Sequence, residues 1–332
     1  MSVLFEAVVR AISARVSNCR WRRWGQWGWV VAIASCRTAA APVPGSIEAQ
    51  AVSEARCGAE FVYVPGGRFL AGSTPEEIDY AYQISAQAAT DGNDISLTEA
   101  EANLRSRGWF DREPGQRREN LTDYCISKTL VTNAQYQEFV LAIGYHAPGI
   151  TPENYQEQNL RVHSYDDIKP YAWRSYVYPE GKADHPVVLV SQEDAVAYAL
   201  WRSQEDSVEY RLPSALEWEK AARSPDGRYF AWGNEWEDDR TNWQGSGEDG
   251  TSAVGTYPDT SLYGAADMAG NVFEFTSDTF TRDQQVRSIM KGCAWDDLPG
   301  FCRAAYQHSR PVNYKHILFG FRLVKPAVPA NP

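Results

Sequence analysis

The sequence predicts an α+β fold made of short antiparallel strands, a few helices and much irregular loop. Three observations lead to this prediction: helix-capping patterns in the middle of the chain, turn and short-strand patterns from Arg228 onward, and a composition with 24 glycines, 12 tryptophans and 18 tyrosines. Hydrophobic residues make up 43% of the 332 residues, which suffices for a core. The sequence contains no internal repeat, coiled-coil heptad or glycine-rich phosphate loop.

The predicted elements follow one another along the chain. In order, they are a hairpin of strands 61–64 and 68–71 that turns at Pro65-Gly66-Gly67, a helical stretch over 75–106, and helices from Thr132 or Asn133 to about Ala142, over 193–202 and over 215–223. The last two helices have capping signals, because Ser191 precedes Asp194, and Ser214 precedes Glu217, by three residues. The residues expected to face the core from these helices are Tyr136, Phe139, Val140, Leu216, Trp218 and Ala221.

The charge distribution argues against nucleic acid as a partner. The formal net charge is −11, and the first 36 residues carry five arginines against one acidic residue. Without them the chain has 27 basic and 42 acidic side chains, a net charge of −15, which repels nucleic acids and anionic membranes. The sequence contains no basic patch with interleaved aromatic residues.

The N-terminal segment 1–36 has the pattern of an export signal. A basic region ends at Arg23, and an apolar stretch over 29–35 leads to Cys36. Ile33-Ala34-Ser35-Cys36 resembles a bacterial lipobox, in which Cys36 is lipidated; cleavage near residues 39–41 is the alternative. The apolar stretch is too short to span a bilayer. We expect three further segments: a flexible tether over 37–56, a folded domain over 57–326 and a tail over 327–332.

Four cysteines remain outside the leader, which is an even number and suits disulfides in an oxidising compartment. Cys293 and Cys302 are nine residues apart and are candidates for closing a loop, in which case Cys57 pairs with Cys125. Three pairings are possible, and the sequence does not choose among them. A zinc site is disfavoured because the chain has no C-x-x-C pair and no nearby histidine pair.

Glu274 stands between Phe273 and Phe275 in the run Asp267–Phe275, directly after a Gly-Asn turn. A carboxylate buried among aromatic rings needs a cation or several hydrogen-bond donors, because isolated burial costs several kcal/mol. A hard cation such as calcium takes oxygens from carboxylates and from backbone carbonyls. The alternative is that Glu274 pairs with an arginine such as Arg303 or Arg322.

This run resembles the signature of the formylglycine-generating enzyme family, also called the sulfatase-modifying factor family, which has a C-type-lectin-like fold. Further blocks resemble the same family in the same order: residues 61–73, 126–128, 131–136, 185–195, 211–219, 232–233 and 320–322. The resemblance implies one calcium site at Asp267, Gly270, Val272 and Glu274, and a second at Asn242, Trp243, Asp249 and Thr251, with glycine, valine, tryptophan and threonine contributing carbonyl oxygens.

The cysteines depart from the family pattern. The resemblance implies that active members bind copper(I) through two cysteines with four residues between them, and thiolates suit this soft ion. Here the first catalytic position falls near Asp297, and Cys293 stands where the family has glycine. A carboxylate is a poor ligand for copper(I), so we expect no copper site and no ordinary formylglycine synthesis.

The resemblance also places the family's substrate cleft along this segment. The candidate pocket residues are Trp295, Asp296, Asp297, Arg303, Tyr306 and His308. Their aromatic, carboxylate and guanidinium groups suit a peptide or sugar. The alternative is that Trp295 and Tyr306 fill the core while Asp296 and Asp297 form a solvated turn. His316, in a loop, is expected at the surface.

Two classes of function follow from the sequence. The first is an exported enzyme that tailors a protein or peptide oxidatively without the copper cysteine pair. The second is a noncatalytic lipoprotein that binds a peptide, protein or glycan on a lectin-like scaffold. In both cases we expect a monomer in the periplasm or at the outer membrane of a bacterium, which contacts the membrane only through lipidated Cys36.

Overall fold

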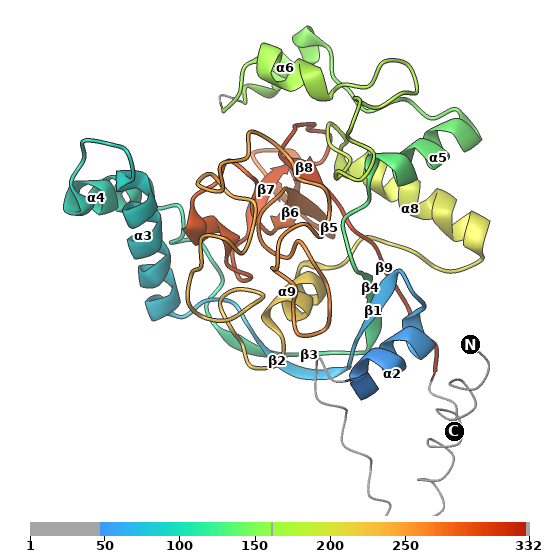
Figure 1. Ribbon diagram of the computed structural model, residues 1–332, viewed down its shortest axis with the longest axis horizontal. Coiled ribbons are helices and arrows are strands. Elements are labelled where there is room, and N and C mark those ends of the chain that lie inside the picture. The colour runs from blue at the N-terminus through green and yellow to red at the C-terminus, as the bar shows by residue number, and fades with distance from the viewer. Residues whose placement is uncertain (1–46, 161, 330–332) are drawn as a thin grey trace, which may run out of the picture. The chain divides into compact units, whose positions relative to one another are not determined.

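Two segments of the chain, residues 61–71 and 117–127, run antiparallel to each other in the computed structural model, which describes residues 47–160 and 162–329 (Figure 1). Their pairing is divided between two sheets: β1 (Phe61–Val64) pairs with β4 (Tyr124–Ser127), and β2 (Gly67–Ala71) pairs with β3 (Arg117–Leu121). The short strand β9 (Val324–Lys325) completes a three-stranded sheet in the order β1-β4-β9.

The predicted strands β1 and β2 are present, but the predicted hairpin is wrong because the two strands do not pair with each other. At Gly66 the chain passes so close to its partner segment that an added Cβ would lie 2.9 Å from the backbone nitrogen of Asp123. The chain therefore continues from β1 into β2 close beside its antiparallel partner segment, and does not reverse its direction between the two strands.

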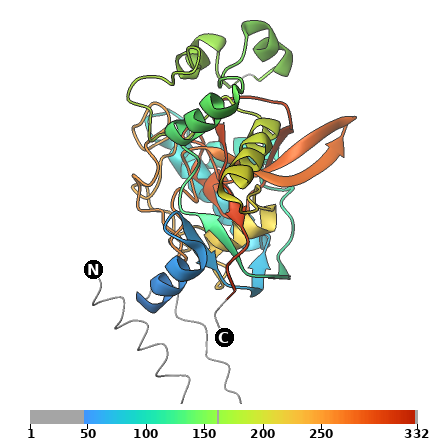
Figure 2. The ribbon, with the colours of Figure 1, turned by 90° about the vertical axis from the view of Figure 1, so that its right-hand side faces the viewer.

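A four-stranded sheet in the order β7-β6-β5-β8 lies at the centre of the described region (Figure 1). Its strands are β5 (Phe273–Arg282), β6 (Gln285–Lys291), β7 (His308–Pro311) and β8 (Phe319–Gly320). Strands β5 and β8 are parallel, with Phe273 opposite Phe319. The far ends of β5 and β6 form a hairpin that extends away from the other elements (Figure 2).

The helices lie around these sheets. Their bounds are α2 (Ile47–Cys57), α3 (Pro75–Thr90), α4 (Leu97–Arg107), α5 (Asn133–Ile143), α6 (Pro152–Gln158), α7 (Tyr165–Ile168), α8 (Gln192–Asp206) and α9 (Ala215–Arg223), with 3-10 turns η1 (Lys169–Tyr171) and η2 (Pro299–Cys302). In Figure 1, α3 and α4 lie on one side of the four-stranded sheet and α5 and α8 on the other.

Capping boxes at Thr132, Ser191 and Ser214 begin α5, α8 and α9, as the sequence predicts for the last two. In each box the N-cap hydroxyl accepts a hydrogen bond from the backbone three residues on, and that residue's side chain accepts one from the N-cap backbone. Trp218 and Ala221 are buried as expected, whereas Leu216 is half-buried and does not join the core.

The tether expectation does not hold for residues 47–56, which form most of helix α2. Arg56 anchors this helix by an ion pair of 2.6 Å with Asp123 and a hydrogen bond of 2.8 Å to the carbonyl of Val328. The expected leader and Cys36 lie outside the described residues. Within residues 47–160 and 162–329, no helix has the length and apolar character to cross a membrane.

Candidate functional site

The segment after strand β6 is closed by a disulfide between Cys293 and Cys302. A second disulfide joins Cys57, at the end of α2, to Cys125 in β4. This is the pairing expected if Cys293 and Cys302 close their own loop. Because the sulfur atoms of Cys293 and Cys302 are bonded to each other, neither is a thiolate in this structure.

A small cavity of about 60 Å³ lies where this segment meets the ends of β5, β7 and β8. Its apolar lining residues are Leu160, Val162, Phe273, Leu318 and Phe319, and its polar lining residues are Asp296, Asp297, His308, Arg310 and His316. Three of the residues predicted from the sequence, Asp296, Asp297 and His308, therefore lie around one cavity.

The two aspartates at the cavity differ in their surroundings. Asp296 Oδ2 lies 2.9 Å from His163 Nε2, so a histidine from a distant part of the chain holds this carboxylate. Asp297 Oδ2 accepts a hydrogen bond of 2.8 Å from the backbone nitrogen of Ala294. Burial, with the charge of Asp296 next to it, raises the pKa of Asp297 well above its ordinary value. The protonated, neutral form of Asp297 is therefore favoured over its charged form.

His308 begins strand β7 and stacks on Phe273, with 4.4 Å between ring centroids. Its Nδ1 lies 3.4 Å from the hydroxyl of Tyr306. Burial, together with the nearby guanidinium groups of Arg310 and Arg287, lowers the pKa of His308 well below its ordinary value. The imidazole is therefore neutral at physiological pH and available as a hydrogen-bonding group.

His316 is 1% exposed, so the expectation that it lies at the surface is wrong. Its loop folds beneath α6, where His316 Nε2 lies 3.1 Å from the hydroxyl of Tyr155. Burial, with nearby His163 and Arg310, lowers the pKa of His316 to about 3. The ring therefore forms part of the cavity wall as a neutral group.

Several buried polar atoms around the cavity have no hydrogen-bond partner among the described residues. They are Asp296 Oδ1, His316 Nδ1, Arg310 Nε and Trp295 Nε1. Buried polar atoms in native proteins are nearly always hydrogen-bonded, and an unmade bond costs about 1–3 kcal/mol.

The remaining predicted pocket residues do not line the cavity. Trp295 is 8% exposed and packs against His163, with 5.3 Å between ring centroids. Tyr306 is buried behind His308, and Arg303 is buried in an ion-pair network with Glu77 and Glu113. For Trp295 and Tyr306 the core alternative of the sequence analysis is therefore the correct one.

His163, Arg310 and α6 are parts of the site that were not predicted from the sequence. His163 precedes α7 and His316 lies more than 150 residues later, so no local pattern connects the two. Arg310 sits on β7 two residues after His308, on a strand too short for its pattern to mark an inward face. Helix α6 has a start signal, because Thr151 caps it and Pro152 follows, and this signal was available in the sequence.

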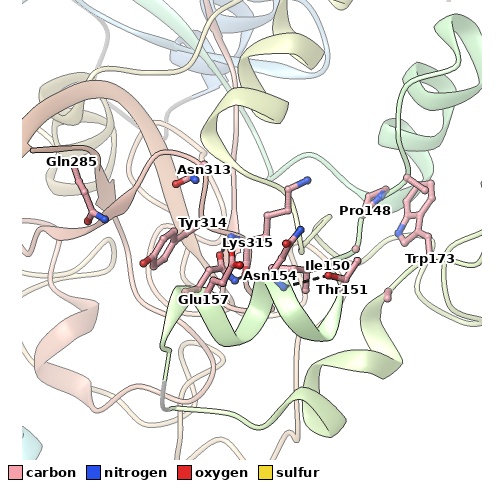
Figure 3. Close-up of a pocket in the computed structure, with 14 residues that line it drawn as sticks. Pro148, Ile150, Thr151, Asn154, Glu157, Trp173, Gln285, Asn313, Tyr314 and Lys315 are labelled. Atoms are coloured by element: carbon pink, nitrogen blue, oxygen red, sulfur yellow. Dashed lines mark hydrogen bonds between the residues drawn. The ribbon is translucent and has the colours of Figure 1, made fainter.

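A second, wider cavity of about 760 Å³ is lined in part by α6. Its lining residues include Pro148, Ile150, Thr151, Asn154, Glu157, Gln158, Trp173, Gln285, Asn313, Tyr314 and Lys315. Figure 3 shows Tyr314 and Lys315 beside Asn154 and Glu157 of α6, with Gln285 at one end and Trp173 at the other. This cavity has the size of a ligand cleft.

The wall between the two cavities is hydrogen-bonded. Gln158 Nε2 donates to the Lys315 carbonyl at 3.2 Å, and the Lys315 nitrogen donates to Gln158 Oε1 at 2.6 Å. Lys315 lines the wide cavity and the next residue, His316, lines the small one. The two cavities are therefore neighbours across a single turn of chain.

The family model described as the sulfatase-modifying factor enzyme 1-like domain matches residues 48–327, most of the chain. The chain belongs to this family. The matched region begins nine residues before the predicted domain start at residue 57, which agrees with the position of α2.

Members named as active and as inactive enzymes are both among the relatives. The inactive C-alpha-formylglycine-generating enzyme 2 of Mus musculus is 30% identical over 265 residues, which cover 71% of this chain and 74% of the relative. The formylglycine-generating enzyme of Mycobacterium tuberculosis is 32% identical over 214 residues, covering 51% of this chain and 68% of the relative. Family membership thus leaves activity to be argued from the site.

Solved structures show the same fold. The structure of PvdO from Pseudomonas aeruginosa has a TM-score of 0.57 and 20% identity, and covers 80% of this chain and 94% of PvdO. The crystal structure of CarF has a TM-score of 0.54 and 21% identity, covering 80% of this chain and 98% of CarF. Both similarities support the predicted α+β, C-type-lectin-like architecture of the sulfatase-modifying factor family.

The first calcium site implied by the family lies where three carboxylates are buried near one arginine. Both Glu274 oxygens accept hydrogen bonds from Arg322, at 2.6 and 2.8 Å, so the arginine alternative describes this side chain. Asp267 Oδ2 accepts from the Gly255 nitrogen at 2.8 Å, and buried Asp259 accepts from the Asp267 nitrogen. Burial raises the pKa of all three carboxyl groups. Within the described part of the chain, no group of three or more histidine, cysteine, aspartate or glutamate side chains is arranged to hold a metal ion.

At the second implied site, the structure brings together Asn242 and the backbone before Thr251. Asn242 Nδ2 donates to the carbonyl of Gly250 at 2.9 Å, and Asn242 Oδ1 accepts from Ser246. The Trp243 carbonyl also accepts from Ser246. The Asp249 side chain is exposed, so three of the four expected residues are close together and the carboxylate is not enclosed with them.

Proposed function

We propose that this family member binds a peptide in the wide cavity beside Asp296 and Asp297, and does not make formylglycine through a copper-bound cysteine pair. The observation that carries the proposal is the disulfide between Cys293 and Cys302. The sulfur atoms of this segment are bonded to each other. By the family resemblance, the first catalytic position falls near Asp297. A hard carboxylate and a disulfide offer copper(I) no pair of thiolates.

Peptide binding is supported by the form of the wide cavity. Amide and hydroxyl groups from Asn154, Asn313 and Tyr314 line a cleft of about 760 Å³, together with Glu157 and Gln285. Groups of this kind hydrogen-bond to peptide backbones, and the tyrosine adds an apolar face. The cavity is several times larger than a single side chain needs, which suits an extended segment.

The second candidate is an enzyme that tailors a peptide oxidatively without the copper pair. It is favoured by the chemistry of the small cavity, where a protonated carboxyl at Asp297 and a neutral imidazole at His308 line the same space. These two groups supply a proton donor and a proton acceptor, as general acid–base chemistry requires. Ligand binding remains the better supported role because it needs no further group.

A peptide display library screened against the full-length protein tests the first proposal. We expect enriched peptides to bind in calorimetric titration, and to bind at least about tenfold more weakly to Asn154→Ala or Tyr314→Ala variants, because each removes cleft contacts. Asp283→Asn, whose side chain is 91% exposed at the tip of the β5–β6 hairpin, is the control. Enrichment of glycans and not of peptides on arrays contradicts peptide binding.

Copper chemistry and oxidation are tested with the same preparation. Incubation with copper(I) and a cysteine-bearing sulfatase peptide is expected to give no aldehyde by mass spectrometry. Aldehyde formation contradicts the first proposal. The second candidate predicts that the protein changes the mass of an enriched peptide and consumes oxygen as it does so. If both effects are seen and are lost in His308→Gln, the protein is a catalyst and not only a binding protein.

We further propose export with a lipid anchor at Cys36 and structural calcium at the two implied sites. The two disulfides support export, because disulfides persist mainly in oxidising compartments. Labelling of bacterial cells with an alkyne fatty acid is expected to mark the wild-type protein and not Cys36→Ala. Unmarked wild-type protein recovered in the soluble periplasmic fraction argues instead for simple cleavage after the leader.

A further inference from the structure

The β5–β6 hairpin has one strand edge that no described element covers. The hairpin extends away from the other elements (Figure 2), and residues 279–286 are all exposed. Strand β8 pairs only with the first two residues of β5, and the Ser277 nitrogen donates to the Pro213 carbonyl at 2.8 Å. Past Asp278, the outer edge of β5 has no backbone hydrogen bond to any described residue.

The turn of the hairpin determines which backbone groups lie along this free edge. Its residues Asp283-Gln284 have positive φ angles of 51° and 63°, as in the two-residue turns typical of hairpins. Such a turn joins Arg282 and Gln285 by a hydrogen bond, and bonded and non-bonded pairs then alternate along the two strands. The N–H and C=O groups of Thr279 and Thr281 therefore point outward, away from β6.

This edge lacks the features that usually keep a free strand from pairing. Proteins protect exposed edges with charged residues or proline, because unpaired backbone groups are a template for another strand. Residues 279–281 are instead threonine, phenylalanine and threonine, all of which favour strands. The Phe280 side chain is 38% exposed. The stretch is thus suited to pairing with a further strand.

The sequence of the edge is complementary to itself. Residues 278–282 read Asp-Thr-Phe-Thr-Arg, so an antiparallel pair centred on Phe280 places Thr279 opposite Thr281 of a second copy. The outward N–H and C=O groups of these threonines then exchange hydrogen bonds. The two phenylalanines form a non-hydrogen-bonded pair, in which side chains lie closest. Asp278 faces Arg282 of the second copy at both ends, and such opposite charges favour a cross-strand pair.

We propose that two copies of this protein associate by antiparallel pairing of their β5 edges, with Phe280 on the two-fold axis. The length of the free edge fits this register. The turn of the second copy falls opposite Ser277, where the Pro213 carbonyl already occupies the edge, so the added strand ends where the free edge ends. The assembly departs from the monomer expected from the sequence, because no local pattern shows that an edge of β5 stays unpaired in the fold.

The charged ends are available for this pairing. Asp278 Oδ2 accepts a hydrogen bond of 2.6 Å from the Ala215 nitrogen, and no described group binds its Oδ1. The Arg282 side chain is 56% exposed and lies 3.7 Å from Asp283, which is itself 91% exposed. Five residues from each copy make a small interface, so we expect a weak dimer that depends on concentration.

The pairing does not depend on the wide cavity. That cavity is lined by Gln285 of β6 and by Asn313 and Tyr314 after β7, whereas the second copy adjoins the outer edge of β5. Association of two copies and peptide binding are therefore measured separately, and either can fail without the other.

Sedimentation velocity of the full-length protein, over a concentration series up to the millimolar range, tests the proposal. We expect wild type to dimerise and Thr281→Pro to do so at least about tenfold more weakly, because proline removes the outward N–H from each copy. The hairpin keeps its own hydrogen bonds, since proline is tolerated where a strand N–H faces solvent. Thr281→Val keeps the N–H at the same exposed position and should dimerise as wild type does.

A mixing experiment tests the register. Phe280→Glu and Phe280→Lys each place like charges opposite each other at the two-fold axis, and each alone should dimerise at least about tenfold more weakly than wild type. An equimolar mixture should recover a dimer with one copy of each, identified by native mass spectrometry. Val286→Glu and Val286→Lys, at a 48% exposed position on β6, are the control pair and should gain nothing from mixing.

Three outcomes overturn the proposal. The first is a protein that stays monomeric throughout the concentration series. The second is a dimer that is as strong in Thr281→Pro as in wild type, or Phe280 variants that gain nothing from mixing, because the interface then lies elsewhere. The third is a monomer in which an enriched display peptide protects the amides of Thr279 and Thr281 from hydrogen exchange, because the edge then binds a foreign strand.

Discussion

At the scale of single residues, Arg223 shows how charge is buried in this protein. Its guanidinium is 0% exposed and lies 2.8 Å from Glu77 and 3.3 Å from Glu219. Lys291 and Arg303 join the same carboxylates, so the network links α3, α9 and β6. Removing Arg223 leaves Glu77 and Glu219 with Arg303 and Lys291 as their remaining cations, so their buried charge is compensated less well.

Arg223→Met is therefore expected to lower the free energy of unfolding by about 3–5 kcal/mol. The matched control is Arg240→Met, because Arg240 pairs with Glu237 at the surface, with 34% and 46% of the two side chains exposed. That change is expected to cost less than about 1 kcal/mol. Urea denaturation measures both, and similar small losses for the two variants would show that the buried network contributes no more than a surface pair.

Tyr263 gives a prediction for alkaline pH. Burial raises its pKa from 10.0 to about 12, so the folded protein keeps the hydroxyl protonated where the unfolded chain ionises it. The stability this contributes is present in full below pH 10 and is lost as pH rises toward 12. Tyr263→Phe should reduce the fall in unfolding free energy across this window by about 1–2 kcal/mol. Parallel wild-type and variant curves from pH 9 to 12 would contradict this.

Some residues around the small cavity can be found from the sequence, because their chemistry and their position in the chain coincide. Asp296, Asp297 and His308 are polar residues on a segment that the family resemblance marks as the cleft, and the structure brings them together. His163 and His316 reach the same place through α6 and its packing, which no local pattern encodes. Arg303 was misplaced because a guanidinium suits a buried network as well as a ligand pocket.

At the scale of elements, capping chemistry made the helices the most predictable part of the fold. Ser191 with Asp194 and Ser214 with Glu217 fix helix starts through bonds made within four residues. The pairing of β1 and β2 was not predictable in this way. It depends on β3 and β4, about fifty residues later, which compete for the same backbone groups.

The disulfide between Cys57 and Cys125 ties α2 to the three-stranded sheet and closes a loop with a sequence separation of 68. In the chain-entropy account, closing a loop of this length restricts the unfolded chain by about 4 kcal/mol, and removing native disulfides costs about 2–5 kcal/mol. The double variant Cys57→Ala with Cys125→Ala should lose stability in that range, measured by urea unfolding.

Helix α2 provides the check on this prediction. Its second anchor, the ion pair of Arg56 with Asp123, persists without the disulfide, so the helix itself should remain. Hydrogen exchange is expected to show protection of α2 in the double variant at a reduced level. Unchanged unfolding free energy in urea would mean that the unfolded chain is not appreciably restricted by the crosslink.

At the scale of the whole molecule, the chain has the fold of its family, and the two cysteines of the segment after β6 are bonded to each other. The α+β architecture and the family followed from the sequence, and the observed disulfide pairing is one of the three that the sequence left open. The two cavities did not, because each is assembled from segments that lie far apart in the chain. Activity in such a molecule depends on which side chains line the retained cleft.

Calcium is the whole-molecule prediction, because an ion bound only to the folded state stabilises the entire domain. Asp259, Asp267 and Glu274 bring three buried carboxyl groups to one arginine, Arg322; burial raises the pKa of all three, and the charge of Asp267 raises the pKa of the other two further. A cation held by Asp267 and nearby carbonyls would relieve this. At a calcium concentration of about 100 times Kd, the expected gain is about 2.7 kcal/mol, or several degrees in Tm.

Differential scanning calorimetry with calcium, with chelator and with magnesium tests the prediction. Calcium should raise the Tm of the wild-type protein, and Asp267→Asn should lose most of that rise, because it removes the carboxylate charge and keeps the side-chain shape. Asp283→Asn, exposed at the hairpin tip, should respond to calcium as wild type does. A wild-type Tm that is the same in calcium and in chelator would contradict calcium binding. The buried carboxyl groups would then be neutral because they are protonated, as their raised pKa values favour.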